Sequence, residues 1–203
     1  EAMYHYALFL INVGRPWQAE PHLRTCIRLD PTHVKAYLSL QKVYQATPGV
    51  SKSQEAQMYE EVARALQPRL DALPDPVTDP WVRDYADLLY NAGTVHLGSL
   101  GMGDKNIFKA IQYLKDGIGV YARLPTTDHS TTHVAYCHNN LGIAHDKLGD
   151  RPQALTHYEA ALRFLPRFTR AITNVGNIHK DAGRLQEAAR YYRDAIATNG
   201  SFA

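Results

Sequence analysis

The chain has little cysteine, no long apolar run and no excess of charge of one sign. Its two cysteines, Cys26 and Cys137, lie far apart and form no CxxC pair, which favours a reducing intracellular compartment, cytoplasmic or nuclear. No apolar stretch approaches the roughly 20 residues that span a bilayer, so no membrane partner is predicted. The 22 basic and 20 acidic residues give a net charge of +2, and this balance predicts no nucleic-acid partner.

Sequence signatures of catalysis are also missing. The chain contains no GxSxG, HExxH or GxxxxGK[ST] motif, the spacings that place a nucleophile, a metal-bound water or a phosphate cradle. The glycines of the GSLGMGD segment follow no predicted strand, so they do not match a dinucleotide-binding turn. We therefore predict no catalytic residue, no cofactor and no enzymatic activity within these 203 residues.

What the chain does contain is a duplication with a period of 34 residues. Residues 139–166 and 173–200 align without a gap. The residues that recur at matching positions are Asn140, Gly142, His145, Gly149, Ala154, Tyr158 and Ala161 in the first copy and Asn174, Gly176, His179, Gly183, Ala188, Tyr192 and Ala195 in the second. A fixed period of this length, with small and aromatic residues at set offsets, indicates an array of helix–turn–helix repeats.

Each unit carries the residues that two packed helices need. Gly149 and Gly183 are placed to end the first helix of their units with a left-handed cap. Ala154 and Ala161 lie two turns apart on one face of the second helix. Their small side chains let neighbouring helices approach closely, and we expect Tyr158 to fill the gap between them.

The same template fits five units, which predicts a single all-α domain of at least ten helices without strands. The units are predicted at 1–33, 34–70, 86–124, 135–168 and 169–202, with linkers at 71–85 and 125–134. Pro68 and Pro166 are predicted to close their units, and Asp79 with Pro80 to start a helix near residue 80. We expect the solenoid to depart from a uniform superhelix at the two linkers. Neither end carries the polar capping helix that usually protects a solenoid, so the chain is expected to be a fragment of a longer protein.

The alanines, the Leu-Gly or Val-Gly pair, the mid-repeat glycine and the closing proline resemble the tetratricopeptide repeat (TPR) family over nearly the whole chain. This resemblance implies a right-handed α-solenoid of about five TPR units, irregular in the middle. The units at 135–168 and 169–202 are nearest to the family consensus. Gln41 stands where the family has Gly or Ala, so we expect looser packing in the second unit.

A narrower resemblance concerns the stretch from Asn174 to Ile196, which is similar to the repeats that precede the catalytic domain of O-linked N-acetylglucosamine transferases. Asn91, Asn140 and Asn174 share the sixth repeat position, where that family has a ladder of asparagines lining the superhelix. As an alternative function, this resemblance implies the substrate-recruiting arm of a larger glycosyltransferase.

The TPR resemblance also implies that the first helices line a concave groove that binds a protein or a peptide. The residues carried over as protein-binding are Lys35, Lys42, Tyr90, Tyr136, Asn139, Arg170, Asn177 and Lys180. Amides and cations at such positions suit hydrogen bonding to an extended peptide. The chain is therefore predicted to be a protein-interaction scaffold, and self-association through its exposed end repeats is a further prediction.

Histidine is plentiful, with ten copies, and raises the question of a metal site. His129 and His133 lie four residues apart, so one helical face can present both, and Cys137 and His138 follow closely. No fourth ligand stands at a suitable spacing, and His129 falls in a predicted linker. The sequence therefore predicts no metal site.

Three other histidines, His96, His145 and His179, share the eleventh position of their units, where the family usually has tyrosine. We predict that they pack between the two helices of a unit.

Overall fold

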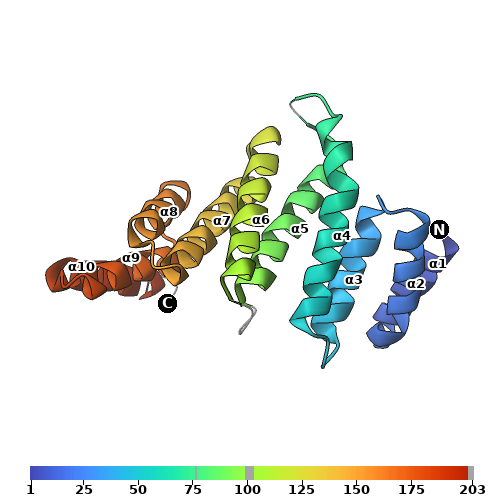
Figure 1. The fold of residues 1–203 in the computed structure, drawn as a ribbon, viewed down its shortest axis with the longest axis horizontal. Coiled ribbons are helices and arrows are strands. Elements are labelled where there is room, and N and C mark those ends of the chain that lie inside the picture. Colours follow the sequence, from blue (N-terminus) through green and yellow to red (C-terminus); the bar gives the residue numbers. More distant parts are fainter. Residues whose placement is uncertain (76, 99–102, 201–203) are drawn as a thin grey trace.

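A computed structural model describes residues 1–75, 77–98 and 103–200. Over these ranges the chain forms ten helices and no strand, so the predicted all-α class is confirmed (Figure 1). The helices are α1 (Ala2–Asn12), α2 (Pro16–Leu29), α3 (Val34–Ala46), α4 (Lys52–Asp71), α5 (Pro80–Gly98), α6 (Gly103–Arg123), α7 (Asp128–Lys147), α8 (Arg151–Phe164), α9 (Thr169–Asp181) and α10 (Leu185–Gly200). Most of the GSLGMGD segment and the last residues of the predicted fifth unit lie outside the described residues.

The helices follow one another along the long axis of the molecule, from α1 at one end to α10 at the other (Figure 1). Each packs against the next in the chain, and α1, α3, α5 and α7 also contact one another in succession. The odd-numbered helices therefore form one layer of an α-solenoid, and the even-numbered helices cover it. Within the described ranges, none of the helices combines the length and the apolar character that crossing a membrane requires.

Glycine turns join the two helices of the more regular units. Gly14, Gly149 and Gly183 adopt φ angles of 77°, 79° and 75°, a region that side-chain-bearing residues rarely enter. After α7, the Asp150 N–H donates to the His145 carbonyl over 2.9 Å, and the Gly149 N–H donates to the Asp146 carbonyl over 2.9 Å. These two bonds form a Schellman motif. The predicted left-handed caps at Gly149 and Gly183 are confirmed.

Close approach of paired helices requires glycine at the eighth repeat position. A Cβ added to Gly142 would lie inside the van der Waals surface of the Tyr158 ring, and one added to Gly176 would lie 2.8 Å from Cε1 of Tyr192. Tyr158 is buried and fills the gap between α7 and α8, as predicted. In the second unit Gln41 takes this position and is itself buried, and α3 and α4 pack less closely than the two helices of any other unit. The looser packing expected there is confirmed.

Histidines at the eleventh repeat position stack on an aromatic ring of the second helix. The ring centroids lie 5.4 Å apart for His96 and Tyr113, and 5.3 Å apart for His179 and Tyr191. His145 stacks in the same way on the His157 ring, also at 5.3 Å. These contacts agree with the predicted packing role.

The middle of the solenoid differs from the prediction in where its helices begin and end. α7 begins at Asp128, so residues 128–134 of the predicted linker 125–134 are helical. The reason is a capping box in which the side chains of Thr127 and Ser130 each accept a bond from the other residue's backbone N–H. The helix start predicted near Pro80 is confirmed, which shortens the linker predicted at 71–85. Helices α4 to α7 have 20, 19, 21 and 20 residues, whereas the other six have 11 to 16, so much of the extra sequence lengthens helices.

Pro68 does not end α4, which continues to Asp71; this corrects the prediction that Pro68 closes the second unit. Arg123, at the end of α6, stabilises the extension from outside. Its guanidinium donates to the carbonyls of Leu70 and Leu73 over 3.1 and 2.7 Å and pairs with Asp75 at 2.6 Å. Leu70 lies in the last turn of α4, where its carbonyl also accepts from the Leu73 N–H over 3.0 Å, and Leu73 lies just after the end of the helix. The guanidinium therefore adds a donor to the carbonyls at and just beyond the helix end.

Candidate functional site

A groove cavity of about 580 Å³ opens between α5, α7 and the turn from α8 to α9. The residues that line it are Tyr90, Tyr136, Asn139, Asn140, Leu165, Arg167, Phe168, Thr169, Arg170 and Thr198. Four of the eight predicted protein-binding residues are among them, together with one predicted ladder residue. They come from successive first helices because the 34-residue period returns each such position to the same layer.

Aromatic rings form one wall of this cavity. The ring centroids of Tyr90 and Tyr136 lie 6.2 Å apart, and those of Tyr136 and Phe168 lie 5.1 Å apart. Tyr90 and Tyr136 stand on α5 and α7, and Phe168 immediately precedes α9. Rings held against one another in this way offer apolar area with little loss of side-chain entropy on binding.

Amides form a hydrogen-bonded row across the three helices of the groove. Asn140 donates to the Thr94 hydroxyl over 3.2 Å, Asn139 donates to the Asn140 side-chain oxygen over 3.3 Å, and Asn174 donates to the Asn139 oxygen over 3.1 Å. The row contains Asn140 and Asn174 of the predicted ladder, but Thr94 rather than Asn91 is its member on α5. Asn139 is only 4% exposed, so its amide chiefly orders the row.

Arginine supplies the charge of the cavity. Among the lining residues, the only charged side chains are Arg167 and Arg170, and both residues are exposed. The cavity therefore combines positive charge, aromatic rings and amide groups, a combination that suits an acidic ligand with an apolar part.

The other four predicted protein-binding residues lie away from this cavity. Asn177 is exposed on α9, where its side-chain oxygen accepts a bond from the Tyr192 hydroxyl over 2.7 Å. Lys180 is exposed on the same helix and pairs with Asp181 at 3.7 Å. Lys35 and Lys42 are exposed on α3, towards the other end of the solenoid.

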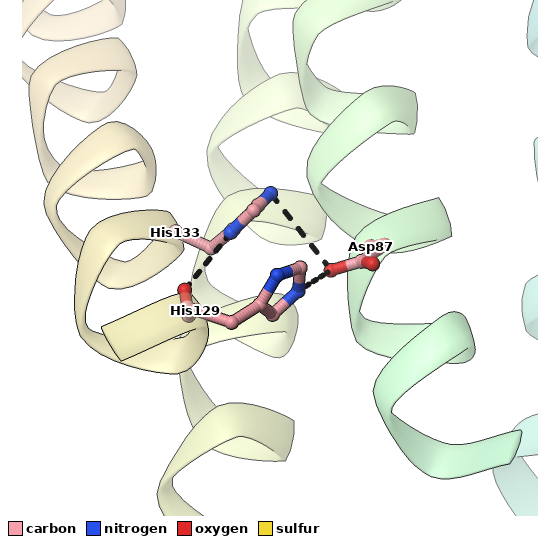
Figure 2. Close-up of side chains that lie close together, drawn as sticks. All are labelled: Asp87, His129 and His133. Atoms are coloured by element: carbon pink, nitrogen blue, oxygen red, sulfur yellow. Dashed lines mark hydrogen bonds and ion pairs between the residues drawn. The ribbon is translucent and has the colours of Figure 1, made fainter. Parts of the chain in front are cut away.

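A cluster of Asp87, His129 and His133 lies beside the cavity (Figure 2). Asp87 projects from α5, and both histidines project towards it from α7. The Asp87 Oδ1 lies 2.9 Å from Nε2 of His129 and 4.0 Å from Nε2 of His133. The His133 ring also meets the Tyr90 ring edge-on at 5.7 Å, which connects the cluster to the aromatic wall.

Sequence reasoning missed this cluster for two reasons. The spacing of the two histidines is a valid signal, but the sequence offers no fourth ligand at a suitable spacing, and it places His129 in a predicted linker that is in fact helical. Asp87 lies 42 residues before His129, and no local pattern relates the two. Only the packing of α5 against α7 brings them together.

Burial changes the acid–base behaviour of groups around the cluster. The Tyr121 hydroxyl donates to Asp87 Oδ1 over 2.5 Å, and burial together with this carboxylate raises the pKa of Tyr121 far above its ordinary value. Tyr121 therefore stays a hydrogen-bond donor at neutral pH. Burial, helped by the charge of Asp87, also raises the pKa of Cys137 to about 12, so this thiol stays protonated.

These features define an α-solenoid of helix–turn–helix repeats with a polar and aromatic groove on the layer of first helices. Sequence models of the tetratricopeptide repeat match residues 135–168 and 169–199, the two units predicted to be nearest to consensus. No curated protein sequence matches the chain. Over these two units the chain is similar to the tetratricopeptide repeat, and the solved structures below share the fold of the whole chain.

Several solved structures share the fold. The crystal structure of MamA is 19% identical with a TM-score of 0.70, and the alignment covers 96% of this chain and 95% of MamA. YrrB, described as a TPR protein with an unusual peptide-binding site, is 18% identical with a TM-score of 0.63, over 97% of this chain and 84% of YrrB. PilF of Pseudomonas aeruginosa is 17% identical with a TM-score of 0.60, and the alignment covers 97% of this chain and 75% of PilF. At these identities the likeness concerns the fold, and the comparisons do not support a glycosyltransferase association.

Proposed function

We propose that this protein is an interaction scaffold that binds an extended, acidic peptide segment of a partner protein in the cavity between α5, α7 and α9. The TPR fold supports a protein-interaction scaffold in general. The observation that carries the finer proposal is the convergence of Arg167 and Arg170 with the aromatic wall on one cavity of about 580 Å³.

The chemistry of the lining determines the kind of peptide. Arginine forms paired hydrogen bonds with carboxylates and also stacks on planar groups. Tyr136 and Phe168 offer an apolar surface beside Arg170. A segment in which an acidic residue stands close to an aromatic or aliphatic one would satisfy both parts of the lining.

One structural neighbour also supports a peptide as the ligand. YrrB has an unusual peptide-binding site, and extended peptides are a common ligand of repeat-protein grooves.

A charge-reversal pair tests the proposal. An array of short peptides that pair acidic with apolar residues would first be screened for binding, and the best peptide measured by fluorescence anisotropy. We expect Arg170→Glu to weaken binding by about tenfold or more, equal to about 1.4 kcal/mol. Lys42→Glu makes the same charge change on an exposed residue of α3 and should change the affinity less than about twofold at moderate salt, because screening is strong beyond roughly 10 Å. Equal losses in both variants would show a non-specific charge effect and contradict the site.

Self-association through the end repeats remains a second proposal. Its support is the exposure of large apolar side chains on the first two helices, with Phe9 56% and Trp17 62% exposed. Light scattering over a concentration series would test it; a constant monomer mass would oppose it.

A further inference from the structure

Three metal-binding side chains from two helices meet beside the groove, and among the residues that the structure describes this is the one place where such a group forms (Figure 2). The Oδ1 of Asp87 and the Nε2 atoms of His129 and His133 all lie within 4.8 Å of one another. With bonds of about 2.0–2.2 Å, two donors of a tetrahedral zinc ion lie roughly 3.4 Å apart. The distances from Asp87 to the two histidines, 2.9 and 4.0 Å, lie on either side of that value.

Hydrogen bonding fixes the state of the His133 ring. Its Nδ1 lies 2.9 Å from the carbonyl oxygen of His129, which can only accept, so Nδ1 carries a hydrogen. In the neutral ring Nε2 is therefore a bare lone pair, and it faces the Asp87 carboxylate from 4.0 Å. Two electron-rich atoms face each other across this gap, and a cation between them would satisfy both.

The second histidine is held in place as well. The rings of His129 and His133 stack on each other with centroids 4.0 Å apart. His129 Nε2 donates its hydrogen to Asp87 in the absence of metal. Zinc at this atom requires only that the hydrogen move to Nδ1 of the same ring, so the binding of zinc releases no net proton from His129.

Outer contacts support two of the three proposed ligands. In metalloproteins the ligand histidines usually donate their other N–H to a carbonyl or carboxylate, and ligand carboxylates are themselves hydrogen-bonded. The Nδ1–H of His133 donates to the His129 carbonyl, and the Asp87 carboxylate accepts from the Tyr121 hydroxyl. The His129 side chain is 39% exposed, which leaves a path for the ion from solvent.

We propose that Asp87, His129 and His133 bind one zinc ion through Oδ1 and the two Nε2 atoms, with at least one coordination position left open beside the groove. Two imidazoles and one carboxylate are a donor set suited to zinc, and histidines four residues apart on a helix present both rings to one ion. The open position accepts water or a donor atom of a bound molecule. This site stands independently of peptide binding.

The test is a zinc titration of the tag-free chain after treatment with a chelator. We expect one equivalent of zinc to bind, measured by isothermal titration calorimetry. His129→Gln, His133→Gln and Asp87→Asn each remove one ligand while keeping a hydrogen-bonding side chain, and each should weaken zinc binding by more than about tenfold. Circular dichroism checks that each variant keeps its helices.

The matched control is His138→Gln, because His138 stands on the same helix and forms a separate contact with His157, Nδ1 to Nδ1 at 3.1 Å. This variant should bind zinc as the wild type does. Zinc binding that survives in the three cluster variants but is lost in His138→Gln would overturn the proposal in favour of the His138–His157 pair. The absence of saturable binding by the wild type would overturn it outright and leave Asp87 and His129 as an ordinary ion pair.

A measurement on the wild-type chain does not depend on how the variants fold. Paramagnetic Co²⁺, added in place of zinc, should broaden the amide resonances around residues 87, 129 and 133 before any others. Broadening centred elsewhere would contradict the assignment of the ligands.

Discussion

At the scale of single residues, the fold depends on positions where only a small side chain fits. Gly142 lies so close to Tyr158 that any Cβ would overlap the ring. Gly119 is also within a helix, on α6, but has open space where its Cβ would stand. The two glycines therefore separate the effect of packing from that of helix propensity.

We predict that Gly142→Ala lowers the free energy of unfolding by about 1–3 kcal/mol, because the ring of Tyr158 must move out of a packed interface. Gly119→Ala should be neutral or should stabilise by up to about 1 kcal/mol, because alanine favours the helix. Urea unfolding followed by circular dichroism measures both. A stabilising Gly142→Ala would refute the close approach of α7 and α8.

A second prediction at this scale concerns acid. Burial, together with repulsion from the neighbouring His138 and His145, lowers the pKa of His157 to about 4. The unfolded chain takes up the proton near pH 6.5, the ordinary value for histidine, so between about pH 6.5 and 4 the unfolded state binds more protons. The free energy of unfolding therefore falls as the pH is lowered through this window.

In His157→Gln, the free energy of unfolding should fall less on acidification than in the wild type. We expect a difference of roughly 1 kcal/mol, after allowance for the partial solvent exposure of the ring. Thermal unfolding at pH 7 and pH 4.5 measures it. His22→Gln, which replaces a histidine outside this group, should keep the wild-type pH dependence. The same slope in wild type and His157→Gln would argue against a depressed pKa.

At the scale of helices, the irregular middle is held by contacts between units. Arg123 at the end of α6 caps the last turn of α4, and the Val77 N–H donates in return to the Arg123 carbonyl over 3.0 Å. The guanidinium of Arg69 lies 4.6 Å from the Trp81 ring centroid, a further link from α4 to α5. These contacts fix the connection between the second and third units.

We predict that Arg123→Ala lowers the free energy of unfolding by about 1–3 kcal/mol, because the Leu73 carbonyl loses its side-chain donor, the Leu70 carbonyl keeps only backbone N–H donors, and the ion pair with Asp75 is lost. Arg83→Ala removes an exposed arginine of the same region and should cost less than about 0.5 kcal/mol. Hydrogen exchange should also become faster at the end of α4 in Arg123→Ala. An unchanged exchange rate there would contradict the capping role.

The limits of sequence reasoning appear at the same scale. The left-handed caps at Gly149 and Gly183 were predictable because the sequence shows a glycine at the end of each helix, and this glycine recurs after 34 residues. Both glycines do adopt a positive φ angle. The helical continuation through Pro68 was not, because its stabilising partner, Arg123, lies in the next unit. Thr127 and Ser130 form the capping box that starts α7. The sequence did not single them out, because other Ser and Thr residues nearby are equally suited to cap the start of a helix.

At the scale of the whole molecule, the solenoid gathers residues at a fixed repeat position into one layer. This explains why Tyr90, Tyr136 and Arg170, predicted from the repeat position, meet at one cavity. Asp87 was not predicted as a partner of His129 and His133, because both histidines precede the unit predicted at 135–168 and so hold no repeat position that would relate them to α5.

The central claim is that the cavity between α5, α7 and α9 binds an extended acidic peptide. The most direct measurement is a map of amide chemical-shift changes in the isotope-labelled chain as the best peptide from the array is added. We predict that the largest changes fall on residues lining the cavity, such as Tyr136, Asn140 and Arg170, and that α2 and α4 change little. Changes centred on the even-numbered helices, or spread evenly over exposed cations that include Lys35 and Lys42, would contradict it.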